Sequence, residues 1–230
     1  MSGGRRVAII GGGIGGLTLA KTILFHQPDA SVVVYEAWDE VKADRGGSLG
    51  VGVGVWILQA LDLEQPFRAK ANSIHNWVSY SNGTLVAKTD FKGRLNYVMR
   101  GDLTRILSDS LPNGTVQSNR KVIHVTEGGS EVTITFADET TVTADVVVGA
   151  DGFDSVVKRE IFGPSTSTSA GYRFIKVVTK TEVRKSELDT VKVHWTQDDN
   201  GCGWHLMEVP TKDSNPGLRS IRSVRKTGRR

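Results

Sequence analysis

A run of glycines directly after a short apolar segment constrains the fold of this chain more than any other feature. Residues 7–10 predict a buried strand, and five of the next six residues, 11–16, are glycines. Apolar residues then recur at helical spacing from Ile14 to Phe25, and a β-branched segment at residues 31–36 predicts a second strand. Strand, helix and strand together predict a βαβ unit.

Gly11, Gly13 and Gly16 form the pattern G-x-G-x-x-G between this strand and this helix. In dinucleotide-binding proteins the first glycine permits a tight turn and the second leaves room for a pyrophosphate, while the third permits close packing of helix and strand. The first N–H groups of the helix, including those of Ile14 and Gly15, have no partner within the helix and carry a partial positive charge. The segment therefore predicts a site for the phosphates of a dinucleotide.

Glu36 lies 20 residues beyond Gly16, at the end of the second predicted strand. A carboxylate at this place accepts hydrogen bonds from the adenosine ribose and repels a 2′-phosphate. We therefore expect the site to hold FAD or NAD rather than NADP. The alternative is a glycine-rich loop of another kind of α/β protein, and the common register of strand, glycines, helix and acid argues against it.

The βαβ pattern of parallel strands ends at Glu36, and sequence patterns typical of β-hairpins follow. Gly50–Gly54 alternates glycine with valine, which indicates backbone packed closely against a ligand or another strand. Asn82-Gly83 and the segment 128–130 are typical hairpin turns, and the second of these opens an antiparallel meander. The expected elements are a helix at residues 56–63, strands at 75–80, 85–88 and 95–99, a helix beginning at Arg100, and meander strands at 122–126, 132–136 and 140–143.

A second parallel strand is predicted at residues 144–149, followed by Ala150, Asp151 and Gly152 and by a helix at 155–161. Asp151 would then lie at the carboxyl end of a central strand, where such sheets bind ligands. A helix cap is an equally good interpretation of this residue. Arg100 stands at a strand-to-helix junction, where it is either a surface charge or a contact to phosphate or ribose.

The amino-acid composition narrows the possible cofactors, location and binding partners of the chain. The chain has 230 residues and one cysteine, Cys202, and none of its Cys and His residues have the spacing of a metal site, so we expect no metal and a cytoplasmic location. Six of its 29 basic residues lie between Arg219 and Arg230 without an acid among them, so the net charge of +4 belongs to the C-terminal end. We interpret residues 211–230 as a basic, disordered tail and expect neither nucleic-acid nor membrane binding.

These segments resemble the FAD-binding domain of the class A flavoprotein monooxygenases, the para-hydroxybenzoate and salicylate hydroxylase-like family. The resemblance covers about residues 7–164 and rests on three ordered matches. They are residues 7–20 with Glu36, residues 145–155 with Asp151-Gly152, and Arg100 with Leu103 and Leu107.

The resemblance implies an α/β fold: a Rossmann-like FAD-binding domain with an inserted antiparallel β-meander and part of a mixed-sheet substrate domain. It also implies FAD contacts at the glycines, Glu36, Arg45 and Arg100, and places Asp151 near the pyrophosphate. The implied activity is NAD(P)H-driven hydroxylation of an aromatic or related small organic substrate with O₂, through a flavin hydroperoxide. NAD(P)H would bind only transiently. The resemblance leaves the oligomeric state open.

The family's third motif, Gly-Asp followed by Ala-x-His, has no counterpart after Asp151, and we expect a truncated or misassembled gene product. The resemblance predicts FAD-binding segments at 1–70 and 100–164, substrate-domain segments at 71–99 and 165–210, and the tail at 211–230. Three alternatives stay open: a non-catalytic FAD- or ADP-binding fragment, an NAD-dependent dehydrogenase, and a nucleic-acid or membrane role of the basic tail.

Overall fold

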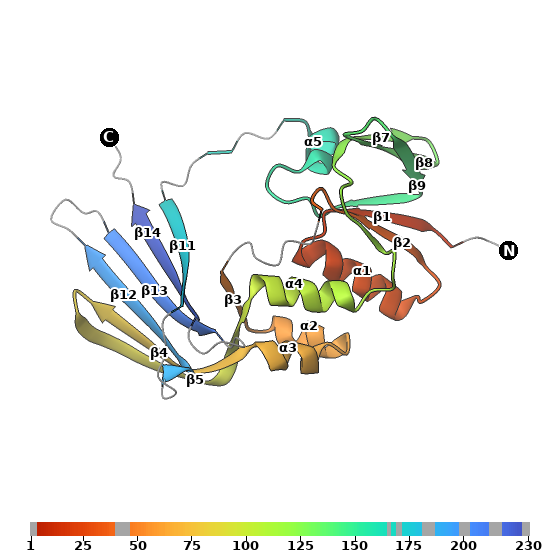
Figure 1. Cartoon of the computed structure of the whole chain (residues 1–230). Coiled ribbons are helices and arrows are strands. Elements are labelled where there is room, and N and C mark those ends of the chain that lie inside the picture. The colour runs from red at the N-terminus through yellow and green to blue at the C-terminus, as the bar shows by residue number, and fades with distance from the viewer. Residues whose placement is uncertain are drawn as a thin grey trace. The chain divides into compact units, whose positions relative to one another are not determined.

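The computed structural model describes residues 4–39, 47–164, 167–168, 172–180, 187–197, 203–211 and 218–226. The chain divides into two compact units (Figure 1). Unit 1 combines Met1–Ala43 with Leu103–Ser167, and unit 2 combines Asp44–Asp102 with Thr168–Arg230. The chain therefore leaves unit 1 after its first βαβ segment, returns to it, and leaves it again.

A parallel sheet forms the centre of unit 1. Its four described strands are β1 (Arg6–Ile10), β2 (Ser31–Tyr35), β6 (Val116–Gln117) and β10 (Val146–Gly149), in the order β10-β1-β2-β6. Helix α1 (Ile14–His26) connects β1 to β2, which confirms the predicted βαβ unit. In the register of the sheet, Ile10 lies opposite Tyr35 on one side and Gly149 on the other.

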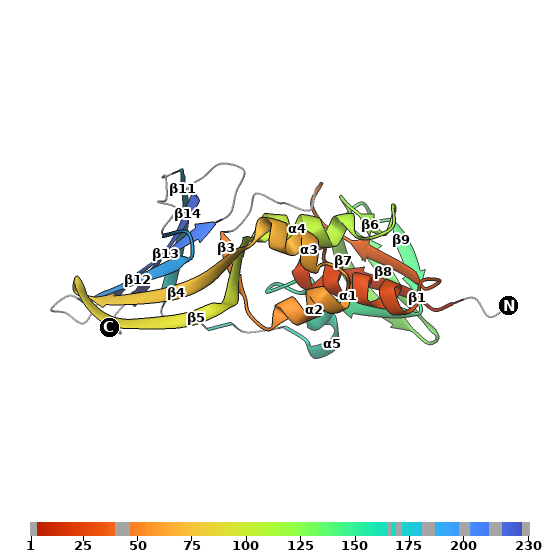
Figure 2. The ribbon, with the colours of Figure 1, turned by 90° about the horizontal axis from the view of Figure 1, so that it is seen from below.

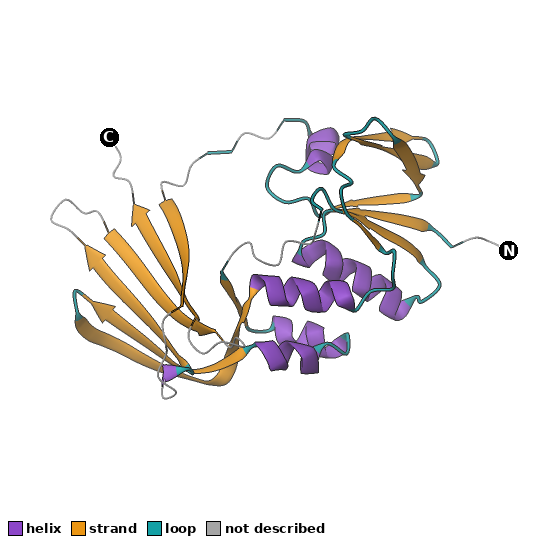
Figure 3. Ribbon diagram, in the orientation of Figure 1, coloured by secondary structure: helices purple, strands orange, loops and turns teal. Residues whose placement is uncertain are grey.

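Unit 1 is layered, with the sheet between α1 and a second, antiparallel sheet (Figure 3). The antiparallel sheet is the predicted meander, made of β7 (Val122–Gly128), β8 (Glu131–Phe136) and β9 (Thr141–Ala144). Its apolar face packs against the parallel sheet, where the rings of Tyr35 and Phe136 meet edge to face at 4.9 Å. On the opposite side, Leu17 and Ala20 of α1 are fully buried. These two packed faces fix the strand ends at which the candidate site lies.

Two further helices confirm predictions in unit 1 and at its border. Helix α4 (Arg100–Asp109) begins at the predicted residue, and its part from Leu103 onward belongs to unit 1. Helix α5 (Val156–Phe162) follows β10 and contacts both β7 and β10. It ends at Phe162, and the C-cap residue Gly163 has a φ of +78°, a value that favours glycine.

Unit 2 contains a mixed sheet with seven described strands in the order β11-β14-β13-β12-β4-β5-β3. Strands β4 and β5 form a long curved pair in Figure 2. The packed apolar face centres on Ile74, Tyr97, Val191, Val193 and Met207. The elements are β3 (Ser48–Val51), α2 (Gly54–Ala60), α3 (Glu64–Lys70), β4 (Asn72–Ser81), β5 (Thr84–Met99), β11 (Tyr172–Lys180), β12 (Thr190–Gln197), β13 (Gly203–Thr211) and β14 (Leu218–Lys226).

The first hairpin of unit 2 confirms its prediction, and the helix before it corrects one. Asn82 and Gly83 both have positive φ, 46° and 81°, as the tight turn between β4 and β5 requires. The helix expected at residues 56–63 instead ends at Ala60, because Asp62 adopts a left-handed φ of 59°, and α3 follows as a separate helix.

The strands expected at 85–88 and 95–99 are parts of one strand, β5. Its pairing with β4 shifts register between Ile74 and Asn76, opposite residues 90–95. Within that segment, Lys92 and Gly93 have positive φ, and Asp90 Oδ1 accepts a hydrogen bond of 2.7 Å from Lys92 N–H. A bulge therefore interrupts the pairing without ending the strand.

The C-terminal end differs from the disordered tail that the charge run indicated. Leu218–Lys226 forms β14, which pairs antiparallel with β11 on one edge and β13 on the other. Its backbone groups are therefore hydrogen-bonded on both sides, which a local run of basic residues does not reveal. Residues 212–217 and 227–230 of the expected tail lie outside the described residues. Residues 44–70, which we assigned to the FAD-binding core, group with unit 2.

Candidate dinucleotide site

The candidate site lies at the carboxyl edge of the parallel sheet of unit 1. Gly11 follows β1, Glu36 follows β2, and Ala150 and Asp151 follow β10. Two hydrogen bonds of 2.8 Å align these ends, from Gly11 N–H to the Tyr35 carbonyl and from Ala150 N–H to the Ile10 carbonyl. The chain passes from β1 to β2 on one side, and β10 lies on the other, so the edge beside β1 is a topological switch point. Open α/β sheets bind ligands at such points.

Glycine is required at two positions of the turn that leads from β1 into α1. Gly11 has a φ of +108°, and a Cβ there would lie 2.5 Å from the Ala150 carbonyl oxygen. A Cβ on Gly16 would lie 2.0 Å from the Gly11 carbonyl oxygen, far inside van der Waals contact. The first and third glycines of the pattern therefore serve the tight turn and close packing that the sequence predicted.

The space in front of the helix is open at Gly13 and Gly15. A Cβ added at Gly13 or Gly15 would meet no atom of the described structure within 4 Å. Gly13 is the N-cap of α1, no side chain caps the helix, and its first turn contains no acid. The first N–H groups of α1 are therefore open to an anion, and no carboxylate in that turn repels it.

Glu36 is held against the glycine turn by two backbone donors. Its Oε2 accepts a hydrogen bond of 2.7 Å from Gly12 N–H, and its Oε1 accepts one of 3.1 Å from Trp38 N–H. A Cβ on Gly12 would lie 2.8 Å from the same Oε2, so a side chain there would displace the Glu36 carboxylate. The G-x-G-x-x-G pattern treats this position as variable, and only the third consecutive glycine in the sequence hinted at the constraint.

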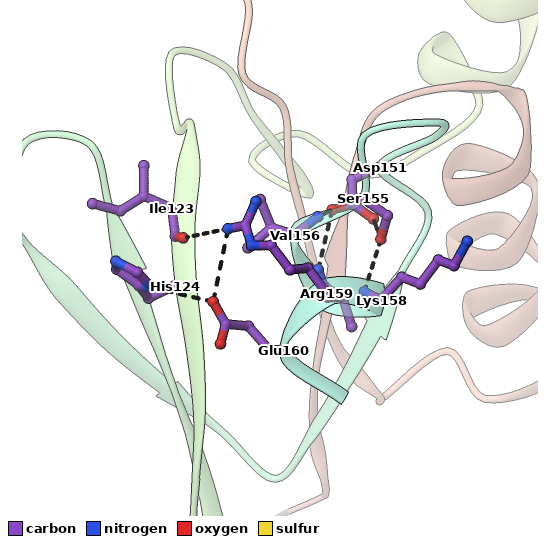
Figure 4. Close-up of polar contacts among 9 residues, drawn as sticks. Ile123, His124, Asp151, Ser155, Val156, Lys158, Arg159 and Glu160 are labelled. Carbon is purple, nitrogen blue, oxygen red and sulfur yellow. Dashed lines mark hydrogen bonds and ion pairs between the residues drawn. The ribbon is translucent and has the colours of Figure 1, made fainter. Parts of the chain in front are cut away.

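Ser155 is the N-cap of helix α5, and the Asp151 side chain also caps this helix start, as Figure 4 shows. Its Oδ1 accepts a hydrogen bond of 2.6 Å from the Ser155 hydroxyl, and its Oδ2 accepts one of 2.6 Å from Val156 N–H. The Ser155 hydroxyl oxygen in turn accepts from Lys158 N–H at 2.9 Å. Of the two interpretations of Asp151, these contacts are those of the helix cap. A contact with a cofactor stays a prediction.

Polar side chains of helix α5 also contact strand β7 of the meander (Figure 4). Glu160 Oε1 lies 3.2 Å from His124 Nδ1 and 3.7 Å from Arg159 Nη2. Arg159 Nη2 also donates to the Ile123 carbonyl at 3.3 Å. These contacts join α5 to β7 and so help to hold the segment that carries Asp151 and Gly152.

The side chains of unit 1 with shifted pKa values lie outside the glycine turn and stabilise the fold. Hydrogen bonds from the Arg6 side chain and backbone lower the pKa of Asp145, just before β10, and the same pairing raises the pKa of Arg6. The Thr140 hydroxyl and N–H lower the pKa of Asp138, and burial raises the pKa of Tyr35. Within the described residues, no group of three or more His, Cys, Asp and Glu side chains is arranged to hold a metal ion.

The structure brings together most of the predicted site residues. Gly11, Gly13, Ile14, Gly15 and Gly16 form one turn, Glu36 contacts that turn, and Asp151 and Gly152 follow the neighbouring strand. Two predicted residues do not fall among the described residues of unit 1. Arg45 lies outside the described residues, and Arg100 belongs to unit 2, where its N–H donates to the Gly47 carbonyl at 3.1 Å.

These residues fit the adenosine and pyrophosphate part of FAD. The uncapped start of α1 suits a pyrophosphate, the open space at Gly13 and Gly15 admits it, and a carboxylate stands where a ribose needs an acceptor. In the described part of the chain, no helix is long and apolar enough to cross a membrane.

Comparisons with known proteins agree with this geometry. A family model described as "FAD binding domain" matches residues 5–227. The chain is 30% identical over 224 residues to 6-hydroxynicotinate 3-monooxygenase of Pseudomonas fluorescens, covering 90% of this chain and 55% of the relative. It is 31% identical over 224 residues to 3-amino-4-hydroxybenzoate 2-monooxygenase of Streptomyces cremeus, covering 89% and 53%. The chain thus spans about half the length of the curated relatives it matches.

A solved structure of Klebsiella pneumoniae HpxO, complexed with FAD and uric acid, has the same fold. The TM-score is 0.78 at 21% identity, covering 95% of this chain and 56% of that chain. The family match and the two monooxygenase relatives confirm the resemblance to the flavoprotein hydroxylases, and the chain belongs to the FAD binding domain family.

Proposed function

We propose that unit 1 binds FAD and that the chain serves an FAD-dependent monooxygenase. Gly13, Ile14 and Gly15 would receive the pyrophosphate, and Glu36 would accept hydrogen bonds from the adenosine ribose. The observation that carries the proposal is the contact of the Glu36 carboxylate with Gly12 N–H at 2.7 Å, directly beside open space at the uncapped helix start. It supports the proposal because a carboxylate acceptor and the first N–H donors of a helix lie together at one edge of one sheet.

The proposed reaction is hydroxylation of an aromatic or related small organic substrate, with O₂ and NAD(P)H as co-substrates. Bound FAD supplies the chemistry, because it accepts hydride from NAD(P)H and activates O₂ once reduced. The residues of this chain bind and orient that cofactor. The names of the two monooxygenase relatives support an aromatic acid as substrate. We also propose a cytoplasmic location.

The experiment is titration of the purified protein with FAD, followed by flavin absorbance and fluorescence. The test variant is Gly13→Val, since a Cβ there meets no atom of the described structure within 4 Å and the side chain would enter the proposed phosphate space. Gly128→Val, at the end of β7, is the matched control. We expect the wild type and the control to bind FAD and the Gly13 variant to bind at least about tenfold more weakly, the effect of losing about 1.4 kcal/mol. A wild type that is colourless after incubation with FAD and removal of the unbound flavin would overturn the proposal.

A second candidate function is binding of FAD or ADP without catalysis. A turnover assay distinguishes it from the monooxygenase. One sequence observation favours it. The Gly-Asp that opens the family's third motif occurs in this sequence only as Gly101-Asp102, which lies within α4 and before Asp151. NADH and NADPH oxidation is measured with 6-hydroxynicotinate and 3-amino-4-hydroxybenzoate. Oxidation that rises with either compound and yields a hydroxylated product supports the monooxygenase. FAD binding without such product supports the second candidate.

A further inference from the structure

The tripeptide Asn-Gly-Thr occurs twice in the chain, and both copies lie in exposed turns. Residues 82–84 join β4 to β5, and residues 113–115 lie between α4 and β6. The asparagine and the glycine are exposed in both turns. Because the three residues are identical, a difference in reactivity between the two copies would report the fold around them.

An asparagine that is followed by glycine can lose its side-chain amide without an enzyme. The backbone N of the glycine forms a bond to the asparagine Cγ, the Cγ–Nδ2 bond breaks, and ammonia leaves. Water then opens the five-membered imide at either carbonyl, which gives aspartate or isoaspartate without any change of oxidation state. Glycine favours the reaction because it has no Cβ to obstruct the approach. Ring closure requires the asparagine Cβ and the next backbone N on the same side of the Cα–C bond.

The β4–β5 hairpin holds Asn82 in a conformation that opposes this ring closure. Asn82 and Gly83 have φ values of 46° and 81°, as in a type I′ turn, whose first central residue has a ψ of about +30°. At that ψ, the Cβ and the next backbone N lie on nearly opposite sides of the Cα–C bond. Rotation would also break the hydrogen bond of 2.9 Å from Asn82 N–H to the Trp195 carbonyl and disturb the pairing of Ser81 with Thr84.

The turn at Asn113 imposes fewer restraints. Thr115 N–H donates to the Pro112 carbonyl at 3.1 Å, and φ is negative at Asn113 and +86° at Gly114. These values describe a type II turn, whose first central residue has a ψ of about +120°. The rotation needed for ring closure is therefore smaller than at Asn82. It also leaves the sheet intact, because the first contact of this segment with β2, from Val34 N–H to the Thr115 carbonyl at 2.7 Å, lies beyond Gly114.

We propose that Asn113 is a site of spontaneous deamidation in the folded protein and that the hairpin protects Asn82. The product carries a carboxylate at residue 113, and isoaspartate also lengthens the backbone there by one methylene. Strand β6 begins at Val116, and the Gln117 carbonyl accepts a hydrogen bond of 2.9 Å from Glu36 N–H. The modified residue thus directly precedes the strand that supports the end of β2.

The test is incubation of the full chain at mildly alkaline pH, followed by digestion in acid and mass spectrometry of the peptides. Asn82 and Asn113 are followed in separate peptides, and Asn200-Gly201, which lies outside the described residues, in a third. We expect Asn113 to react about tenfold faster than Asn82, which corresponds to a difference of about 1.4 kcal/mol in local opening. The Asn113→Gln variant should lose the reaction at residue 113 and keep the wild-type rate at Asn82, because glutamine cannot form the five-membered ring.

The same incubation in guanidinium chloride separates the fold from the local sequence. In the unfolded chain the two tripeptides should react at nearly the same rate. Equal rates in the folded protein, or a faster reaction at Asn82, would overturn the inference. A preference for Asn113 that persists in guanidinium chloride would overturn it as well, because its cause would then be the preceding residue, Pro112 in place of Ser81. None of these measurements depends on the proposed binding of FAD.

Discussion

At the scale of single residues, the glycine turn makes a sharp distinction between neighbouring positions. A methyl group on Gly16 would collide with the Gly11 carbonyl, whereas one on Gly15 meets open space. We expect Gly16→Ala to lower the free energy of unfolding by about 1–3 kcal/mol, as overpacking does. Gly15→Ala should leave it unchanged or raise it by up to about 1 kcal/mol, because alanine favours the helix. Urea denaturation of the two variants measures the difference.

An equal loss of stability in both glycine variants would contradict this account. It would mean that the helix start is sensitive to any side chain, and that the 2.0 Å approach to the Gly11 carbonyl is not the cause. Circular dichroism of both variants at the same temperature shows whether the overall helix content is retained.

Residue roles were predictable where chain geometry fixes them. Glu36 could be identified by counting, because the lengths of a strand, a helix and a second strand decide which residue returns to the glycine turn. Gly12 and Trp38 could not, since their importance depends on which way the Glu36 carboxylate turns. Asp151 illustrates the middle case. The sequence placed it at the end of a strand, and only its contacts with Ser155 and Val156 show the helix cap.

At the scale of elements, the meander stabilises unit 1 through one fully buried aromatic ring. Phe136 of β8 is 1% exposed and packs on Tyr35 of β2. We expect Phe136→Ala to lower the free energy of unfolding by about 3–5 kcal/mol, the usual cost of such a truncation. The control is Phe153→Ala, since Phe153 is 80% exposed, and its effect should stay within about 0.5 kcal/mol. If both variants unfold at the same urea concentration, the meander does not share the core of the sheet.

Elements with local signals were predicted, and those that depend on distant partners were not. The hairpin at Asn82-Gly83 and the strand at residues 144–149 carry their own turn and apolar patterns. Strand β14 does not, because its residues read as a basic tail and its position between β11 and β13 is decided by pairing across the chain. Helix α3 was missed because α2 and α3 are separated only by the backbone conformation near Asp62.

At the scale of the whole molecule, stability should depend on pH through Asp145. Its hydrogen bonds with Arg6 lower its pKa in the folded state below the unfolded value of about 3.9. The contribution is therefore present above that value and is lost as the pH falls through the folded pKa. We expect Asp145→Asn to lower the urea midpoint at neutral pH and to reduce its decline in acid.

The control for this pH dependence is Asp154→Asn, which removes an equal charge from an exposed turn. Its midpoint should follow that of the wild type across the acid range. Added salt should weaken the effect of Asp145→Asn, because the Arg6 and Asp145 side chains are both partly exposed. Parallel curves for the wild type and Asp145→Asn would show that this pair does not govern the acid response.

The alternation of the chain between two units was only partly predictable at this scale. Hydrophobic periodicity tells which face of an element is buried, but not which other elements cover it. Residues 44–70 carry helical and glycine signals compatible with either unit, and only their contacts group them with the mixed sheet.

The two hydrogen bonds that hold Glu36 have a thermodynamic consequence for ligand capture. A glutamate side chain that is mobile before binding loses rotamer freedom when it accepts a hydrogen bond from a sugar hydroxyl. That entropy loss weakens the binding. Here the carboxylate is already immobilised by Gly12 and Trp38, and each oxygen keeps an unused lone pair direction. Little additional ordering would be required of the protein at this point, and a residue one methylene shorter would forfeit that preorganisation.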